Sequence, residues 1–219
     1  MIKISKTQKP QILQDNADTW KKELMEYVSK GEKVPKSLSN KYNDCTVKDA
    51  LKTESSAKCM YCESVVKHVA HEHIEHIKPK SVKKYPSLTF EWSNLGLACP
   101  ICNMNKSDIY DDQIPFINPY IDNPSDFFVA AGPCVFSKPG ERRAELTEKI
   151  IKLNRAELIE QRLERIDYLR ELVDKYNKEA NSTLKSMLLN EINIELGSNK
   201  PYTFVSNALV KIVDSALVV

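Results

Sequence analysis

The sequence is poor in glycine and carries almost no net charge. Only 5 of its 219 residues are glycine, and 32 basic side chains nearly balance 30 acidic ones. Scarce glycine suits a helix-rich chain, because glycine disfavours helix interiors. A formal charge of +2 neither requires nor excludes a nucleic-acid partner.

The sequence also lacks a long hydrophobic run. No stretch of about 18 apolar residues occurs, so we expect no membrane span. Residues 1–10 show no apolar stretch typical of a signal peptide. Six cysteines without a secretory signal are typical of a cytoplasmic protein, in which Cys-x-x-Cys pairs bind metal rather than form disulfides. Two of the six, Cys45 and Cys134, are unpaired in the sequence, and we expect both to be small buried residues.

The other four cysteines form two identical pairs. Cys59 and Cys62 enclose Met-Tyr, and Cys99 and Cys102 enclose Pro-Ile. Two such knuckles can hold one tetrahedral zinc ion through four thiolates. A closed four-thiolate site leaves no open coordination position, so this zinc is expected to be structural.

Hydrophobic periodicity predicts helices on both sides of the cysteines. Residues 109–140 hold five prolines and predict loop with short strands. Asn154, followed by Glu157, resembles a capping box that would start a long helix. The predicted helices cover Asp18–Lys30 with Gly31 as the C-cap, a short stretch around Val47–Leu51, a long stretch from Asn154 to about Tyr176, and Ser182–Leu196.

A histidine-rich segment, residues 71–79, lies between the two cysteine pairs. If it forms a strand, His73 and Glu75 project to one face and His76 to the other. A bend or bulge would be needed to bring Glu75 and His76 to one site. Downstream, the second knuckle is expected to open into a short helix whose first turn carries Asn103, Asn105 and Lys106.

Three motifs, in this order, resemble the HNH endonuclease family in its four-cysteine, zinc-bearing form. They are His76-Ile-Lys-Pro79, Trp92-Ser-Asn-Leu95 and Cys99-Pro-Ile-Cys-Asn-Met-Asn-Lys106. The resemblance covers about residues 59–108 and implies a ββα-metal (His-Me finger) core around one catalytic divalent ion. We therefore expect an α+β, mostly α fold, in which helices flank this core.

The resemblance implies a role for each matching residue. His76 corresponds to the general base that activates a water, and Asn94 to the residue that holds the loop and orients that base. Asn103 occupies the motif position near the metal. Glu75 lies where the family has a metal ligand, and His73 is the alternative ligand. An oxygen-rich site favours Mg²⁺ or Mn²⁺.

Lysines surround the motif. They are expected either to contact phosphates or to form a plain solvated surface. Trp92 is expected to anchor the core, and His68 and His71 to be surface or supporting groups. The lysines are Lys78, Lys80, Lys83, Lys84 and Lys106.

Softer motifs over about residues 58–170 resemble the nuclease subunit of Septu-type anti-phage systems. This resemblance implies a defence nuclease that acts on nucleic acid, with DNA favoured over RNA, beside an SMC-like ATPase partner. The motifs are Tyr85-Pro86, Phe90 to Leu95, Ile117-Asn-Pro119, Asp122-Asn-Pro124 and Leu153-Asn-Arg155.

Two alternatives remain open. A non-catalytic zinc-ribbon module that binds nucleic acid or a protein would explain the cysteines, but not His76, Asn94 and Asn103 together. A zinc-dependent hydrolase would need an open site, for instance at His71 and His73.

The chain divides by pattern into three regions. Residues 1–57 are expected to be an N-terminal helical extension, residues 58–140 the HNH domain with its proline-rich loop, and residues 141–219 a C-terminal helical region. The apolar tail from Tyr202 to Val219 packs either on the chain's own helices or on a partner.

Overall fold

The computed structural model describes residues 1–66 and 72–213. The expected α+β, mostly α class is confirmed. The helices are α1 Gln11–Ser29, α2 Lys36–Ser39, α3 Cys45–Ser55, α4 Pro100–Lys106, α5 Pro124–Phe127, α6 Arg142–Ile151, α7 Ala156–Lys178, α8 Ser182–Glu195 and α9 Thr203–Val213. The strands are β1 His73–His76, β2 Leu95–Ala98, β3 Phe128–Ala131 and β4 Cys134–Ser137, and two short 3₁₀ turns cover Pro86–Leu88 and Trp92–Asn94.

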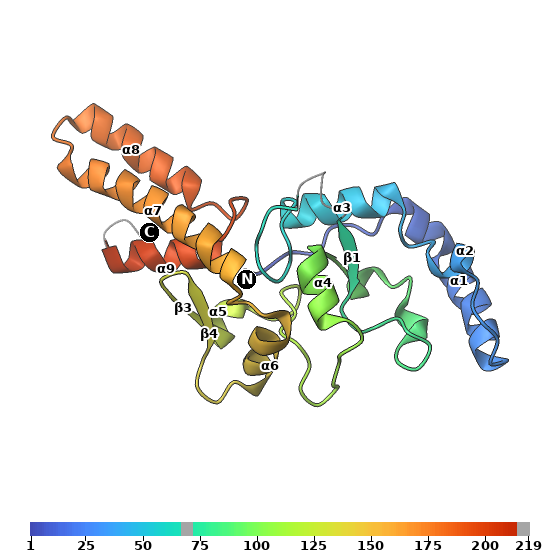
Figure 1. The fold of residues 1–219 in the computed structure, drawn as a ribbon. Helices are drawn as coiled ribbons and strands as arrows, with labels where there is room; N and C mark the ends of the chain where they lie inside the picture. Colours follow the sequence, from blue (N-terminus) through green and yellow to red (C-terminus); the bar gives the residue numbers. More distant parts are fainter. Residues whose placement is uncertain (67–71, 214–219) are drawn as a thin grey trace.

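The molecule is elongated, with the predicted HNH segment in its middle. Helices α1 and α2 lie at one end, and the α7–α8 hairpin extends from the other (Figure 1). Strands β1 and β2 pair antiparallel from His73 opposite Ala98 to His76 opposite Leu95. Helix α4 follows β2 directly, which completes a ββα unit.

One hydrophobic cluster connects most of the chain. It gathers buried side chains from Met1 to Val205, and a smaller cluster joins α7, α8 and α9. Trp92 is buried, as expected for a core anchor, and its indole donates a hydrogen bond to the Thr7 carbonyl at 3.0 Å. The N-terminal residues are thereby fastened to the turn that precedes β2.

The helix boundaries differ from the predicted ones in three places. The C-cap of α1 is Lys30 rather than the expected Gly31, which follows it with a φ of 66°. Helix α1 begins at Gln11, seven residues early, because Pro10 precedes it and proline suits a helix start.

The predicted capping box at Asn154 is wrong. Arg155 is the N-cap of α7, and its side chain makes no capping hydrogen bond. The Asn154 side chain instead pairs with both the backbone N–H and the carbonyl of Val135, at 2.8 Å each.

The two leftover cysteines are not buried as expected. Cys45 is exposed, because it begins α3 directly after the Asp44 cap, where side chains face solvent. Cys134 is only half-buried, in the two-stranded β3–β4 hairpin.

The start of the apolar tail packs on the chain itself. Val205 and Val210 of α9 are buried, and Phe204 packs against the main cluster. The tail residues from 214 onward, and His68 and His71 in the histidine-rich segment, lie outside the described residues.

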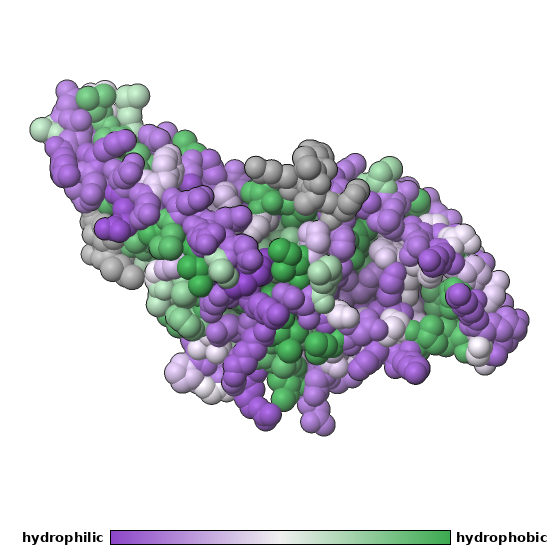
Figure 2. All heavy atoms as spheres, viewed as in Figure 1, coloured by the Kyte–Doolittle hydropathy of each residue, from purple (hydrophilic) through white to green (hydrophobic). Residues whose placement is uncertain are grey.

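The described surface is mostly hydrophilic on the face that Figure 2 shows, with hydrophobic residues gathered near its middle. Helix α4 contributes two exposed apolar side chains, Ile101 and Met104. Among the described residues, no helix combines the length and the hydrophobicity that a bilayer crossing requires.

Candidate functional site

The four paired cysteines converge on one point. Their sulfur atoms all lie within 4.8 Å of one another, and Sγ of Cys62 and of Cys99 are 3.8 Å apart. Two thiolates about 2.3 Å from a tetrahedral zinc ion would be separated by about 3.8 Å. The sequence prediction of a four-cysteine cluster is confirmed, and its donor set and spacing fit zinc.

An arginine from outside the cysteine pairs contacts this cluster. Arg155, the N-cap of α7, points its guanidinium at Sγ of Cys102 (3.6 Å) and at Sγ of Cys99 (3.9 Å). Four thiolates around one Zn²⁺ leave a net charge of −2, so a guanidinium beside them offsets part of that charge. The contact ties the C-terminal helices to the metal centre.

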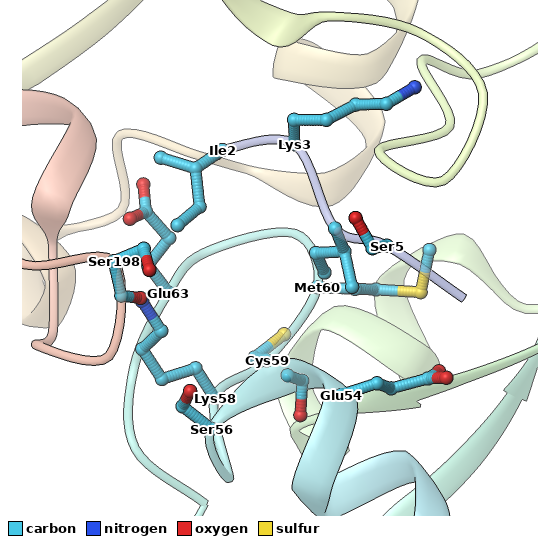
Figure 3. A pocket seen from close by; sticks show the side chains of 12 residues that line it. Ile2, Lys3, Ser5, Glu54, Ser56, Lys58, Cys59, Met60, Glu63 and Ser198 are labelled. Atoms are coloured by element: carbon cyan, nitrogen blue, oxygen red, sulfur yellow. The ribbon is translucent and has the colours of Figure 1, made fainter. Parts of the chain in front are cut away.

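The first knuckle is tied to the same C-terminal region. A cavity of about 220 Å³ opens beside Cys59, and Lys58 and Glu63 face Ser198 at its wall (Figure 3). The Lys58 ammonium donates to the carbonyls of Ser198 and of Lys200, the latter at 2.8 Å. Both knuckles therefore hold the C-terminal helices against the ββα unit.

His76 is buried at the end of β1 in a fixed orientation. Its Nε2 lies 3.0 Å from the carbonyl of Thr89, and because a carbonyl only accepts, Nε2 carries the proton. The Tyr42 ring meets the imidazole edge to face, with centroids 4.5 Å apart. Burial lowers the pKa of His76 to about 3, so the ring is neutral at pH 7 and Nδ1 holds a free lone pair.

Asn94 braces the loop that orients His76. Its Oδ1 accepts from the Lys78 N–H at 2.8 Å, and its Nδ2 donates to the carbonyls of Lys78 (3.0 Å) and Leu88 (3.2 Å). Leu88 directly precedes Thr89, whose carbonyl holds the imidazole. The geometry supports the predicted orienting role, which acts through the backbone.

Asn103 lies on the first turn of α4 and meets His73. Its Nδ2 donates to His73 Nδ1 at 2.7 Å, which leaves its Oδ1 as an unused acceptor in this contact. The predicted alternative metal ligand and the third motif residue are thus in direct contact. No second cluster of three His, Cys, Asp or Glu ligand atoms occurs in the part of the chain that the structure describes.

Glu75 faces away from His76, since the β1–β2 register runs without a bulge. Its carboxylate pairs with the Lys106 ammonium at 2.6 Å, and both side chains are about 1% exposed. Burial raises the pKa of Glu75 to about 7, and the Lys106 charge opposes that rise. Lys106 also donates to the His76 carbonyl at 2.8 Å, so it is a buried brace rather than a surface contact for phosphate.

A cleft of about 280 Å³ runs along β1 and brings the remaining groups together. Three consecutive residues of β1, from Ile74 to His76, line it, as expected along the free edge of a two-stranded sheet. Polar residues complete the wall: Tyr42, Lys80, Asn103, Ser107 and Asp108.

Apart from the buried Lys106, the lysines near the motif divide into three kinds. Lys80 lies in the cleft, whereas Lys78 pairs with Asp112 at 3.0 Å on the surface. Lys83 and Lys84 are exposed, as a solvated surface requires. Sequence reasoning missed Tyr42, because it lies 34 positions before His76 and no motif marks it.

Comparison with known proteins finds a family model that is similar to this segment. Residues 59–108 match the family model described as HNH endonuclease. The HNH resemblance is confirmed over this segment. It contains both cysteine pairs, β1, β2 and α4, so the ββα unit described above is the matching part.

Two curated relatives extend the similarity beyond the HNH segment. A Septu protein PtuB of Bacillus mycoides (strain KBAB4) is 30% identical over 151 residues, which cover 55% of this chain and 51% of the relative. A Septu protein PtuB of Bacillus thuringiensis is 28% identical over 154 residues, which cover 65% of this chain and 58% of the relative. The chain thus spans little more than half the length of these relatives.

Proposed function

We propose that this protein is a metal-dependent endonuclease that hydrolyses phosphodiester bonds of nucleic acid, DNA in preference to RNA. The observation that carries the proposal is the state of His76. Its imidazole is neutral, held by the Thr89 carbonyl through Nε2, and placed at a cleft with a lysine and an asparagine. The unprotonated, fixed Nδ1 can accept a proton from a water, and because burial lowers the pKa of this imidazole, the negative charge of a bound phosphate is needed to stabilise the imidazolium that forms.

Three residues of the cleft have proposed roles in phosphodiester hydrolysis, and two residues outside it support them. Nδ1 of His76 takes a proton from the water that attacks phosphorus. The Lys80 ammonium offsets negative charge on the phosphate, and Asn103 supplies an amide oxygen. Asn94 and Lys106 touch no substrate and keep the strand and loop around His76 in place.

The cleft fits a hard divalent cation better than zinc. Apart from Nδ1 of His76, its free donors are oxygens, from Asn103 and from the exposed carboxylate of Asp108, and Mg²⁺ or Mn²⁺ prefers oxygen ligands. Mg²⁺ usually takes one or two protein ligands and completes its shell with water and phosphate. Such an ion stabilises charge on the phosphate and on the leaving oxygen. Glu75 and His73 remain candidate ligands, provided that Lys106 and Asn103 release them.

A cleavage assay separates this proposal from the zinc-ribbon alternative. Supercoiled DNA and single-stranded RNA are incubated with the protein in Mg²⁺, in Mn²⁺, or in a chelator too weak to extract the zinc. The proposal expects cleavage only with an added divalent ion. A zinc ribbon would bind nucleic acid without cutting it, and a zinc hydrolase would cut without added Mg²⁺ or Mn²⁺.

The similarity to Septu PtuB proteins supports a role in anti-phage defence. We further propose an SMC-like ATPase partner, which the Septu resemblance implies, and a cytoplasmic location, where reduced cysteines remain free to bind zinc. The exposed apolar residues of α8, Leu184, Met187 and Ile194, offer a surface for such a partner.

A further inference from the structure

Tyr42 reaches the cleft from outside the HNH segment. It lies in the loop between α2 and α3, in the N-terminal helical extension. Its ring contacts the His76 imidazole edge to face at 4.5 Å. The Lys80 ammonium donates to its hydroxyl oxygen at 2.5 Å and lies 4.0 Å from its ring centroid. One side chain therefore touches both the proposed base and the one lysine that lines the described cleft.

Resting on the proposed function, we propose that Tyr42 is a positioning residue of this site. Its ring holds the His76 imidazole, and its hydroxyl fixes Lys80 so that the pair binds a phosphate group of the substrate. A tyrosine hydroxyl that accepts from an ammonium still has its own hydrogen to donate. A phosphate oxygen is an acceptor of the kind that an ammonium and a hydroxyl can share.

The N-terminal extension is braced well enough to hold Tyr42 in place. Trp20 of α1 packs edge to face on Phe90, with centroids 5.5 Å apart. Phe90 follows Thr89, whose carbonyl binds His76. The same extension thus supports the imidazole on two sides, through Tyr42 and through the loop that carries Thr89.

The charges around Tyr42 and Lys80 favour the binding of an anion in the cleft. Lys80 is half-buried, and the carboxylate of Asp108 is the acidic group that influences it across the cleft. Asp108 is exposed and free to turn towards solvent or a cation, whereas the Lys106 charge is already matched by Glu75. A phosphate that enters the cleft therefore meets the Lys80 ammonium without a fixed carboxylate in between.

The test uses Tyr42→Phe, which keeps the ring, and Tyr42→Ala, which removes it. Tyr168→Ala, an exposed tyrosine on α7, is the control. In single-turnover cleavage, Tyr42→Phe is expected to raise the half-saturating concentration by about 2- to 10-fold, the effect of one hydrogen bond, with the saturating rate nearly unchanged. Tyr42→Ala is expected to lower the saturating rate by about 10- to 100-fold, because the base is no longer held.

A double-mutant cycle with Lys80→Met shows whether the hydroxyl acts through the lysine. Oligonucleotide binding is measured without divalent ion, and zinc content and thermal melting report on folding. Tyr42→Phe is expected to weaken binding in the wild-type background and to have no effect in Lys80→Met. Equal losses in both backgrounds, or cleavage by Tyr42→Ala at the rate of Tyr168→Ala, would overturn the proposal.

Failure of the proposed function gives a different result. If the wild-type protein cuts no substrate under any condition, the nuclease proposal fails, while the binding cycle still decides whether Tyr42 and Lys80 form a phosphate site. If Tyr42→Ala does not fold, as judged by loss of zinc, the double-mutant cycle of Tyr42→Phe with Lys80→Met alone decides whether Tyr42 is a positioning residue.

Discussion

At the scale of single residues, neighbours in the sequence have separate tasks. Glu75 and His76 are adjacent, yet strand alternation sends their side chains to opposite faces of β1. Glu75 joins a buried ion pair with Lys106, and His76 faces Tyr42 and Thr89. The carboxylate thus fixes α4 against β1, and the imidazole is the proposed base in the cleft that both residues line.

Asn94→Ala is expected to destabilise the protein and to slow cleavage. The change leaves the half-buried N–H and carbonyl of Lys78 without their side-chain partner, which costs about 1 kcal/mol for each lost hydrogen bond. Urea unfolding measures the first effect and single-turnover cleavage the second. Asn16→Ala removes one hydrogen bond on α1 and is the control. An Asn94→Ala protein as stable and as active as Asn16→Ala would contradict the orienting role.

Nucleic-acid affinity is expected to fall as the pH rises through 8. Burial lowers the pKa of Lys80 to about 8, although the Asp108 charge opposes this. Lys80 is therefore a cation below pH 8 and loses its charge above it. We expect binding to weaken several-fold between pH 7 and pH 9, as measured by fluorescence anisotropy with the non-cleaving His76→Ala protein. Lys80→Arg stays charged and should abolish this pH dependence. An equal pH effect in both proteins would show that Lys80 is not the titrating group.

At the scale of elements, the metal cluster connects parts that are distant in the sequence. Helix α4 starts at the second knuckle and carries Asn103, while α7 starts at Arg155, which contacts the same two cysteines. A substitution at the zinc centre is therefore expected to disturb both the cleft, through α4, and the C-terminal helices, through α7.

Arg155→Met is expected to speed zinc loss without unfolding the chain. The substitution removes the guanidinium that faces Cys99 and Cys102, so the thiolates keep their full negative charge. Zinc transfer to a coloured chelator measures the release rate, and the cobalt-substituted protein reports any change at the sulfurs. Arg170→Met, at an exposed site on α7, is the control. Release rates equal to this control would show that Arg155 does not stabilise the centre, whereas Cys99→Ser should lose both zinc and fold.

The sequence predicted elements best where a local signal marks their ends. Helix α4 begins at the second knuckle, and α8 ends before Gly197, both as expected. The start of α7 was predicted one residue early, because Asn154 looks like an N-cap and Arg155 is the actual one. The Asn154 side chain instead hydrogen-bonds to the backbone of Val135, 19 residues earlier in the sequence. Such a long-range contact leaves no local sequence pattern.

At the scale of the whole molecule, the site combines regions that no motif connects. The zinc cysteines could be predicted from their spacing, and the resemblance to the HNH family pointed to His76, Asn94 and Asn103. Tyr42 and Arg155 could not be assigned to the site, because their positions depend on how the N-terminal extension and α7 pack on the ββα unit. The main hydrophobic cluster, with buried residues from Met1 to Val205, sets those positions.

The C-terminal helical region is expected to bind the proposed ATPase through α8. Met187→Glu places a charge on a residue that is 64% exposed, so it should abolish co-elution with the proposed ATPase partner and leave the melting temperature unchanged. Size-exclusion chromatography after co-expression is the measurement. Deleting residues 203–213 should instead destabilise the protein, because Val205 and Val210 are buried. A chain that stays monomeric beside the ATPase would refute the partner proposal.

The central claim is that His76 is the general base of a nuclease. The most direct measurement is the single-turnover cleavage rate of His76→Ala beside the wild-type protein, in Mg²⁺ and at equal zinc content. We predict a loss of about 10²- to 10⁴-fold, which is typical for removal of a general base, with zinc retained. A His76→Ala protein that cuts at close to the wild-type rate would contradict the account.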